Sequence, residues 1–267
     1  MIDAAIKRTP LALAKVASGA QDWLATGASV TSVLGSLVVF DVVQRVAWRM
    51  SPKAQQDAAS AMAWAINRSA MLTGASIAVR GLENVDFSKN YVVVSNHQSM
   101  LDISLLSEHL KPLHPRYVSK VELSRGVPGV SYNLRRGGSA LIDRKNGAQA
   151  KSVIAEITRR VRDEKLTVVI FPEGTRSKTG HMKPFKPGGL RELLRGAPGV
   201  PILPVTSYGG SLLFSRSLKP IVRNVELGMV FHAPFTPSSA DIEDDARYEA
   251  LVKSLESTIA SALPRAD

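Results

Sequence analysis

The chain has 267 residues, no cysteine and a net charge of +11, which fits one large α/β domain with or without an appendage and excludes disulfide scaffolds, zinc ribbons and thiol nucleophiles. The excess of Lys and Arg favours anionic partners such as lipid headgroups, phosphorylated ligands or an acidic carrier protein. Basic residues are dispersed and aromatic residues make up only 6%, so the sequence predicts no nucleic-acid-binding module.

Two helices are predicted in the N-terminal segment, residues 1–74. Mixed helical periodicity over Ile2–Ala25 is followed by an apolar stretch in Val30–Met50, and a second helical pattern covers Pro52–Leu72, with Gly74 as its stop. The uninterrupted apolar run is far shorter than the ~20 residues of a membrane-spanning helix, and it begins too late for a signal peptide. All three Trp lie in this segment, which favours a membrane-surface anchor. Packing on the domain as ordinary core helices is the alternative.

Strands alternate with helices in the remainder of the chain, residues 75–267. Strands are predicted at 77–79, 91–94, 116–118, 140–142, 167–171, 202–205 and 225–231. Helices are predicted at 101–110, 148–162, 190–195 and 240–263. This alternation predicts an α/β domain with a mixed, largely parallel central sheet flanked by helices.

The segment Asn96–Asp102 directly follows a predicted strand, where α/β folds collect their functional residues. Ser99 as a helix N-cap would place Asp102 at the third helical position, where its carboxylate folds back toward the loop. There it could orient the His97 imidazole, which would then accept a proton from a hydroxyl. A helix-capping Asp beside a structural His and a pair of metal ligands are the alternatives. A catalytic metal needs about three protein ligands, and the other four His residues form no ligand-spaced cluster.

A second candidate segment, Phe171–Ser177, also follows a predicted buried strand. Gly174 allows backbone amides to approach a phosphate, and the Arg176 guanidinium can bind a phosphate through two hydrogen bonds. The segment is not a Walker loop, and a tight turn with Glu173 and Arg176 paired is the alternative. Lys120 directly follows another predicted strand, where the alternative is an ordinary exposed lysine.

In order and spacing, these segments resemble the glycerolipid acyltransferase family. The similarity covers about residues 74–232. Asn96–Asp102 resembles the family's NHxSxxD block and Gly137–Arg144 its second block. Phe171–Ser177 resembles the FPEGTRS block and Val200–Val205 the VPIxPV block. Two segments depart from the family pattern. Ser139-Ala140 replaces a bulky apolar pair, and Pro187 stands at an often basic position, so these departures concern the substrate pocket.

The resemblance implies transfer of a fatty acyl group from a thioester of coenzyme A or acyl carrier protein to the sn-2 hydroxyl of lysophosphatidate, giving phosphatidic acid. It implies that His97 is the general base, that Asp102 orients it, and that the alkoxide attacks the thioester directly, with no metal or cofactor. Lys120 and Arg176 would hold the phosphate, and Glu173 would partner Arg176 or a glycerol hydroxyl. The resemblance assigns the acceptor site to five residues: Lys120, Glu173, Gly174, Thr175 and Arg176.

Three other functions stay open at the level of sequence. The same chemistry could act on another lysolipid, such as a lyso-ornithine lipid, or His97 and Asp102 could be metal ligands of a phosphoesterase. A non-catalytic lipid-surface protein would leave the His–Asp pair and the Arg loop unexplained. The net charge of +11 fits both anionic inner-leaflet lipid and an acidic acyl carrier protein. We therefore expect a monotopic protein on the cytoplasmic face of the cell membrane.

Overall fold

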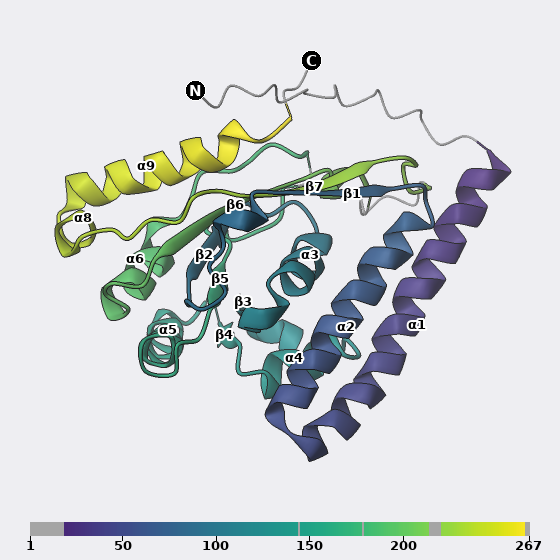
Figure 1. Ribbon diagram of the computed structural model, residues 1–267, viewed down its shortest axis with the longest axis horizontal. Coiled ribbons are helices and arrows are strands. Elements are labelled where there is room, and N and C mark those ends of the chain that lie inside the picture. Colours follow the sequence, from purple (N-terminus) through teal and green to yellow (C-terminus); the bar gives the residue numbers. More distant parts are fainter. Residues whose placement is uncertain (1–18, 144, 178, 214–219, 265–267) are drawn as a thin grey trace.

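A single seven-stranded sheet forms the centre of the protein. The computed structural model describes residues 19–143, 145–177, 179–213 and 220–264 (Figure 1). The strands are β1 (Ser76–Arg80), β2 (Val92–Ser95), β3 (Arg116–Lys120), β4 (Ala140–Ile142), β5 (Val168–Ile170), β6 (Ile202–Tyr208) and β7 (Glu226–Phe231). Their order in the sheet is β1-β7-β6-β2-β5-β3-β4, and all neighbours are parallel except β6 and β7. The predicted mixed, largely parallel sheet is confirmed.

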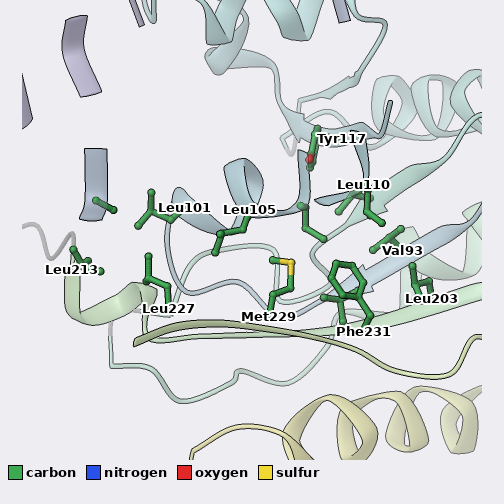
Figure 2. Close-up of a cluster of buried hydrophobic side chains, with 14 of the residues drawn as sticks. Val93, Leu101, Leu105, Leu110, Tyr117, Leu203, Leu213, Leu227, Met229 and Phe231 are labelled. Atoms are coloured by element: carbon green, nitrogen blue, oxygen red, sulfur yellow. The ribbon is translucent and has the colours of Figure 1, made fainter. Parts of the chain in front are cut away.

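Helices cover both faces of the sheet, and two hydrophobic cores result. The flanking helices are α3 (Leu101–His109), α4 (Val130–Arg136), α5 (Gly147–Asp163), α6 (Pro187–Gly196), α7 (Gly210–Leu213), α8 (Ser239–Glu243) and α9 (Asp245–Ser261). Val93 packs with Leu105 and Phe231 on the α3 face (Figure 2), whereas Val92 and Val94 pack on the opposite face with residues of α5, α6 and α9. Burial on both faces explains why the central strands β2 and β5 are almost continuously apolar.

Some local structure differs from the sequence prediction. The predicted helix over 240–263 is divided into α8 and α9, because Asp244 leaves the helical conformation and its carboxylate caps the backbone N–H of Arg247. Helix α4 was not predicted, since it has only seven residues and is bounded by Gly129 and Gly137. Three short 3₁₀ helices, Leu82–Asn84, Lys111–Leu113 and Val121–Ser124, also lie in segments that were not assigned.

The two predicted N-terminal helices are present as α1 (Ala20–Met50) and α2 (Pro52–Met71), which pack side by side as a hairpin (Figure 1). Ser51 separates them, and its hydroxyl accepts a hydrogen bond from the Ala54 N–H at 3.0 Å. Pro52 occupies the first turn of α2, as predicted. Gly74 follows the end of α2 with φ of +78°, the conformation that favours glycine at a helix stop. The part of the predicted helix before residue 19 lies outside the described residues.

The expectation that no segment is long enough to cross a bilayer is wrong. Helix α1 has 31 residues, and an 18-residue window within it has a mean hydropathy of 1.6 with 11% of the window buried. By length and composition it could cross a membrane. The apolar stretch in the sequence ends at Asp41, but the helix continues through Asp41 to Met50, so the stretch underestimates its apolar length.

Helices α1 and α2 have different surroundings. α2 packs against α3, where Asn67 donates to Glu108 at 2.6 Å and accepts from Ser104 at 2.6 Å. α1 packs along α2 and also contacts the rest of the domain, where the Gln44 amide donates to the Gly129 carbonyl at 3.2 Å. The large apolar side chains that α1 leaves exposed are Trp23, Leu24, Val30, Leu34, Val38, Val39, Val42, Val43, Val46 and Met50. α2 is therefore a packed helix of the domain, whereas α1 keeps an uncovered apolar surface.

Candidate active site

The candidate residues gather at one edge of the sheet. β6, β2, β5 and β3 are consecutive neighbours and mutually parallel, so their carboxyl ends meet at the same edge. The His97 loop follows β2, the segment Phe171–Ser177 follows β5, and Lys120 is the last residue of β3. The edge is where parallel sheets bind ligands, because the loops there converge from several strands.

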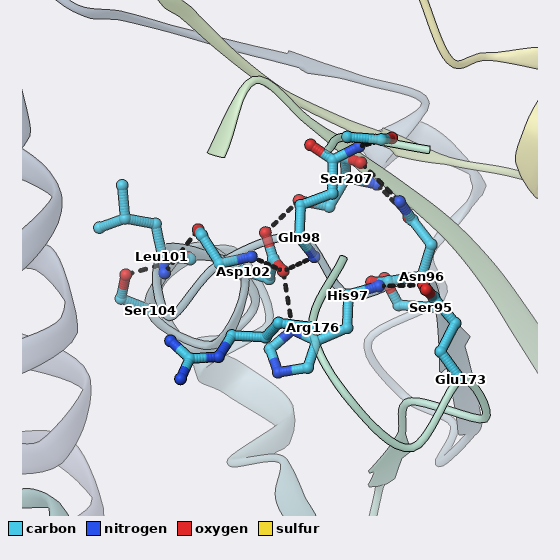
Figure 3. A network of polar contacts seen from close by, with 12 residues as sticks. Ser95, Asn96, His97, Gln98, Leu101, Asp102, Ser104, Glu173, Arg176 and Ser207 are labelled. Atoms are coloured by element: carbon cyan, nitrogen blue, oxygen red, sulfur yellow. Dashed lines mark hydrogen bonds and ion pairs between the residues drawn. The ribbon is translucent and has the colours of Figure 1, made fainter. Parts of the chain in front are cut away.

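His97 and Asp102 are in direct contact (Figure 3). The imidazole Nδ1 lies 2.8 Å from Asp102 Oδ2. The same oxygen accepts hydrogen bonds from the backbone N–H groups of Gln98 and Ser99 at 2.7 and 2.8 Å. The predicted return of the Asp102 carboxylate to the loop is confirmed, although α3 begins at Leu101, one residue later than a Ser99 cap implies. The Ser99 hydroxyl accepts from the Leu101 N–H at 3.0 Å, so it acts at the helix start.

One nitrogen of His97 is available to a substrate. With Asp102 ionised, the Nδ1–H group donates a hydrogen bond to the carboxylate. The basic lone pair of the neutral imidazole is then on Nε2. Within the described part of the chain, no group makes a hydrogen bond with Nε2. The ring stacks on Phe171 with centroids 4.2 Å apart, and its side chain is 14% exposed. The imidazole is thus fixed in orientation with one basic nitrogen accessible, which is the arrangement of a general base.

The loop after β5 holds the backbone of His97 from both sides. The Glu173 carboxylate accepts the His97 N–H at 2.6 Å, and the Ser177 N–H donates to the His97 carbonyl at 2.7 Å. The second oxygen of Glu173 accepts the Lys183 N–H at 3.0 Å. Burial raises the pKa of the Glu173 carboxyl, while the hydrogen bonds from these two backbone groups act in the opposite direction. The paired Glu173–Arg176 turn, one of the alternatives, is not found among the residues that the structure covers, because both Glu173 oxygens are engaged elsewhere.

Two cations near the site have no carboxylate partner among the described residues. The half-buried Arg176 extends alongside His97 in Figure 3, and the exposed Lys120 ends β3. β3 lies two strand spacings from β2, or roughly 10 Å along the sheet edge. Gly174, at φ of +72°, turns the chain between Glu173 and Arg176. The Thr175 hydroxyl accepts a hydrogen bond from Lys183 Nζ at 3.0 Å. Neither cation is therefore neutralised by a carboxylate of the described residues.

Asn96 and Ser207 also belong to the site, although no role there was predicted for either residue. The Ser207 hydroxyl donates to Asp102 Oδ1 at 2.6 Å. The Asn96 side-chain amide binds the backbone of Ser207 twice, donating to its carbonyl at 2.8 Å and accepting its N–H at 2.7 Å. The signal in the sequence was the polar pair Thr206-Ser207 at the end of a strand that is otherwise apolar. The second family block lies on the edge strand β4, and its Arg144 falls outside the described residues.

A metal pair, one of the alternatives, finds no supporting donor set in the described part of the chain. Both oxygens of Asp102 already accept hydrogen bonds, three on Oδ2 and one on Oδ1. Within the described ranges there is no group of three or more His, Asp or Glu side chains that could hold a metal ion. Catalytic metal sites use about three such ligands, so the geometry favours the acid–base arrangement.

Comparison with known proteins agrees with this geometry. The family model described as Acyltransferase matches residues 76–208, a range that contains the side chains of the candidate site. The chain is 39% identical over 135 residues to the 1-acyl-sn-glycerol-3-phosphate acyltransferase alpha of Ovis aries, covering 50% of this chain and 45% of the relative. It is 33% identical over 138 residues to the 1-acyl-sn-glycerol-3-phosphate acyltransferase of Escherichia coli (strain K12), covering 52% and 55%. The chain thus spans about half the length of the curated relatives it matches.

The fold is also shared with a solved structure. The crystal structure of the 1-acyl-sn-glycerophosphate (LPA) acyltransferase from Thermotoga maritima matches 91% of this chain and 95% of its own, with a TM-score of 0.72 and 22% identity. The family match, the sequence relatives and the spacing of the His–Asp pair agree, and the chain belongs to the acyltransferase family.

Proposed function

We propose that this protein transfers a fatty acyl group from an acyl thioester to the sn-2 hydroxyl of 1-acyl-sn-glycerol-3-phosphate and so forms phosphatidic acid. The observation that carries the proposal is the His97–Asp102 contact of 2.8 Å with Nε2 left accessible at the sheet edge. The relatives in the comparison are 1-acyl-sn-glycerol-3-phosphate acyltransferases, which supports this acceptor. The thioester of acyl carrier protein and that of coenzyme A are both candidate donors.

The chemistry follows from the available nitrogen. His97 Nε2 takes the proton of the sn-2 hydroxyl as its oxygen attacks the thioester carbonyl carbon. The new C–O bond forms, the tetrahedral intermediate collapses with cleavage of the C–S bond, and the proton on Nε2 passes to the departing thiolate. Asp102 stabilises the imidazolium that exists between these steps. The chain has no cysteine, and Ser99 serves the helix start, so no acyl-enzyme intermediate is needed.

Recognition of the acceptor phosphate is assigned to Arg176 and Lys120. A phosphate monoester carries up to two negative charges and needs cations that are not already paired. Both side chains meet this condition among the described residues. Gly174 and Thr175 shape the loop between Glu173 and Arg176, and Glu173 contributes by holding the His97 backbone. A lysolipid without a terminal phosphate would leave both cations unused, which argues against the lyso-ornithine alternative.

Arg176→Ala is expected to raise the KM for lysophosphatidate about tenfold or more and to leave the KM for the thioester nearly unchanged. The reason is the loss of a charge-assisted hydrogen bond of ~1.5–3 kcal/mol. Arg176→Lys should restore only part of the affinity, because an ammonium cannot make the planar two-point contact. Initial-rate kinetics with each substrate varied separately provide the measurement. An equal rise in both KM values would assign Arg176 a structural role instead.

One assay tests the proposed function against its alternatives. Purified full-length protein is given a labelled acyl thioester with lysophosphatidate, with lysophosphatidylcholine or with lyso-ornithine lipid, each with and without a chelator. The proposal expects labelled phosphatidic acid as the main product in the presence of chelator. Preference for another acceptor would replace the substrate assignment. Phosphate release that the chelator abolishes would support the phosphoesterase.

We further propose that residues 1–74 attach the acyltransferase domain, residues 75–267, to the cytoplasmic face of the cell membrane. The exposed apolar surface of α1 supports this, because an uncovered row of that length is unusual in a protein surrounded by water. Cationic and aromatic groups meet at the end of α1, where the Arg136 guanidinium lies 5.3 Å from the Trp48 ring centroid. Such pairs suit the headgroup region, where anionic lipid attracts arginine.

The double variant Leu34→Glu, Val38→Glu is expected to reduce sedimentation with vesicles of phosphatidylglycerol and phosphatidylethanolamine several-fold. Both side chains are 57% exposed on α1, so their replacement costs little packing and should leave the melting temperature nearly unchanged. The matched control is Ser254→Glu, Ser257→Glu on the exposed side of α9, which adds the same charge elsewhere. If the two double variants bind vesicles equally, charge alone explains the loss and α1 is not the contact surface.

The same helix also permits a test of the monotopic arrangement. Because the chain has no cysteine, single cysteines introduced at Gly19 and Met50 report the two ends of α1. A helix that lies in the interface leaves both ends open to an impermeant maleimide from the cytoplasmic side only. Labelling of the two ends from opposite sides would show that α1 crosses the bilayer and would overturn the monotopic assignment.

A further inference from the structure

The catalytic carboxylate has a contact on the side opposite His97 that comes from a different part of the chain. Asp102 Oδ2 faces His97 and the loop amides, whereas Oδ1 accepts the Ser207 hydroxyl at 2.6 Å (Figure 3). Ser207 lies near the end of β6, 105 residues along the chain from Asp102. Both residues are fully buried, so no substrate atom reaches this hydrogen bond.

Ser207 is itself held in place by the strand next to it. The Asn96 side chain binds both the N–H and the carbonyl of Ser207, at 2.7 and 2.8 Å, and Asn96 directly precedes His97. At the turn that follows β6, a Cβ on Gly210 would overlap the Ser99 hydroxyl, so the turn packs closely against the start of α3. The end of β6 and the turn after it, which contain Ser207 and Gly210, therefore contact the same loop that carries the general base.

The second contact determines the plane of the carboxylate. The terminal torsion of an Asp side chain has a broad, two-fold energy profile and is not fixed by its rotamer. With hydrogen bonds to Oδ2 alone, the Asp102 carboxylate could rotate about its terminal torsion. The Oδ2 lone pair directed at His97 Nδ1 would then lose its orientation. We infer that Ser207 is a positioning residue for the acyl-transfer reaction, which fixes the Asp102 carboxylate so that it orients His97. This inference rests on the proposed function.

Ser207→Ala in the full-length protein should lower kcat about 10- to 100-fold, the range set by loss of one hydrogen bond to a charged group. The KM values for lysophosphatidate and thioester should stay the same, because Ser207 is buried away from both. The acidic limb of kcat/KM against pH should also move to higher pH. A carboxylate that has lost one donor attracts the imidazolium more strongly.

Thr206→Val is the matched control. Thr206 is equally buried on the same strand, but its hydroxyl contacts His232 and the Ile259 carbonyl, because successive side chains point to opposite faces. Its kcat and pH profile should match those of the wild type even if its melting temperature falls. Ser207→Thr retains the hydroxyl and adds a buried methyl group. It should keep a higher kcat than Ser207→Ala although it is no more stable.

The outcomes separate this inference from the proposed function. A wild-type protein without acyltransferase activity on any lysolipid would overturn the proposed function. With an active wild type, an unchanged kcat and pH profile in Ser207→Ala would overturn the positioning role. Equal losses of kcat in Ser207→Ala and Ser207→Thr that follow the melting temperature would do the same, by showing that only packing matters.

Discussion

His97→Ala should reduce kcat for acyl transfer about 10²- to 10⁴-fold while the protein stays folded. The substitution removes the nitrogen that takes the proton of the acceptor hydroxyl. Without it, that hydroxyl must attack the thioester unaided or through water. His97 contributes little to the core because its ring lies at the sheet edge against Phe171, so the thermal transition should shift by only a few degrees. Steady-state kinetics and a melting curve on the same preparation provide the measurement.

His97→Asn sharpens this test. An asparagine amide can replace the Nδ1–H donor to Asp102, which lies 2.8 Å away in the wild type, but it offers no basic nitrogen in the position of Nε2. The base assignment expects His97→Asn to be as inactive as His97→Ala and closer to the wild type in stability. Turnover near the wild-type rate in either variant would contradict the mechanism and would make His97 a structural residue.

Asp102→Asn should produce a loss approaching the 10⁴-fold effect of the same substitution in serine-protease triads. The amide oxygen can still accept from the backbone of Gln98 and Ser99, and the amide nitrogen can donate to Ser207, so the loop has a route to remain folded. The negative charge beside the imidazolium is lost, however, and His97 no longer has an anionic partner for Nδ1. The measurement is kcat/KM across pH 5–9.

A comparison with Asp102→Ala separates the two functions of this carboxylate. Alanine removes both the charge and the acceptor for two buried backbone N–H groups, at ~1–3 kcal/mol for each orphaned donor. We therefore expect Asp102→Ala to be clearly less stable than Asp102→Asn, with activity lost in both. If Asp102→Asn retained more than a tenth of the wild-type activity, Asp102 would be a helix-start residue alone.

The alternation of apolar strands and amphipathic helices determined the fold class, because strands buried on both faces have a characteristic apolar pattern. The spacing of His97 and Asp102 also determined their contact. Both lie within one strand-to-helix connection, where local backbone geometry returns the carboxylate to the loop. The length of α1 was underestimated, because the helix continues to Met50 beyond Asp41, where the apolar stretch in the sequence ends.

Contacts between distant segments could only be decided by the tertiary structure. Glu173 was expected to partner Arg176, three residues away, or a glycerol hydroxyl. Its carboxylate instead binds the backbone of His97, 76 residues away, since β2 and β5 are neighbours in the sheet. Ser207 reaches Asp102 across 105 residues because β6 lies on the other side of β2. The order of the strands in the sheet brings these side chains together, and that order cannot be read from the amino-acid sequence alone. His97 and Asp102, which we propose perform the chemistry, lie within one short connection that local spacing could identify, whereas the residues that hold them in position come from distant segments.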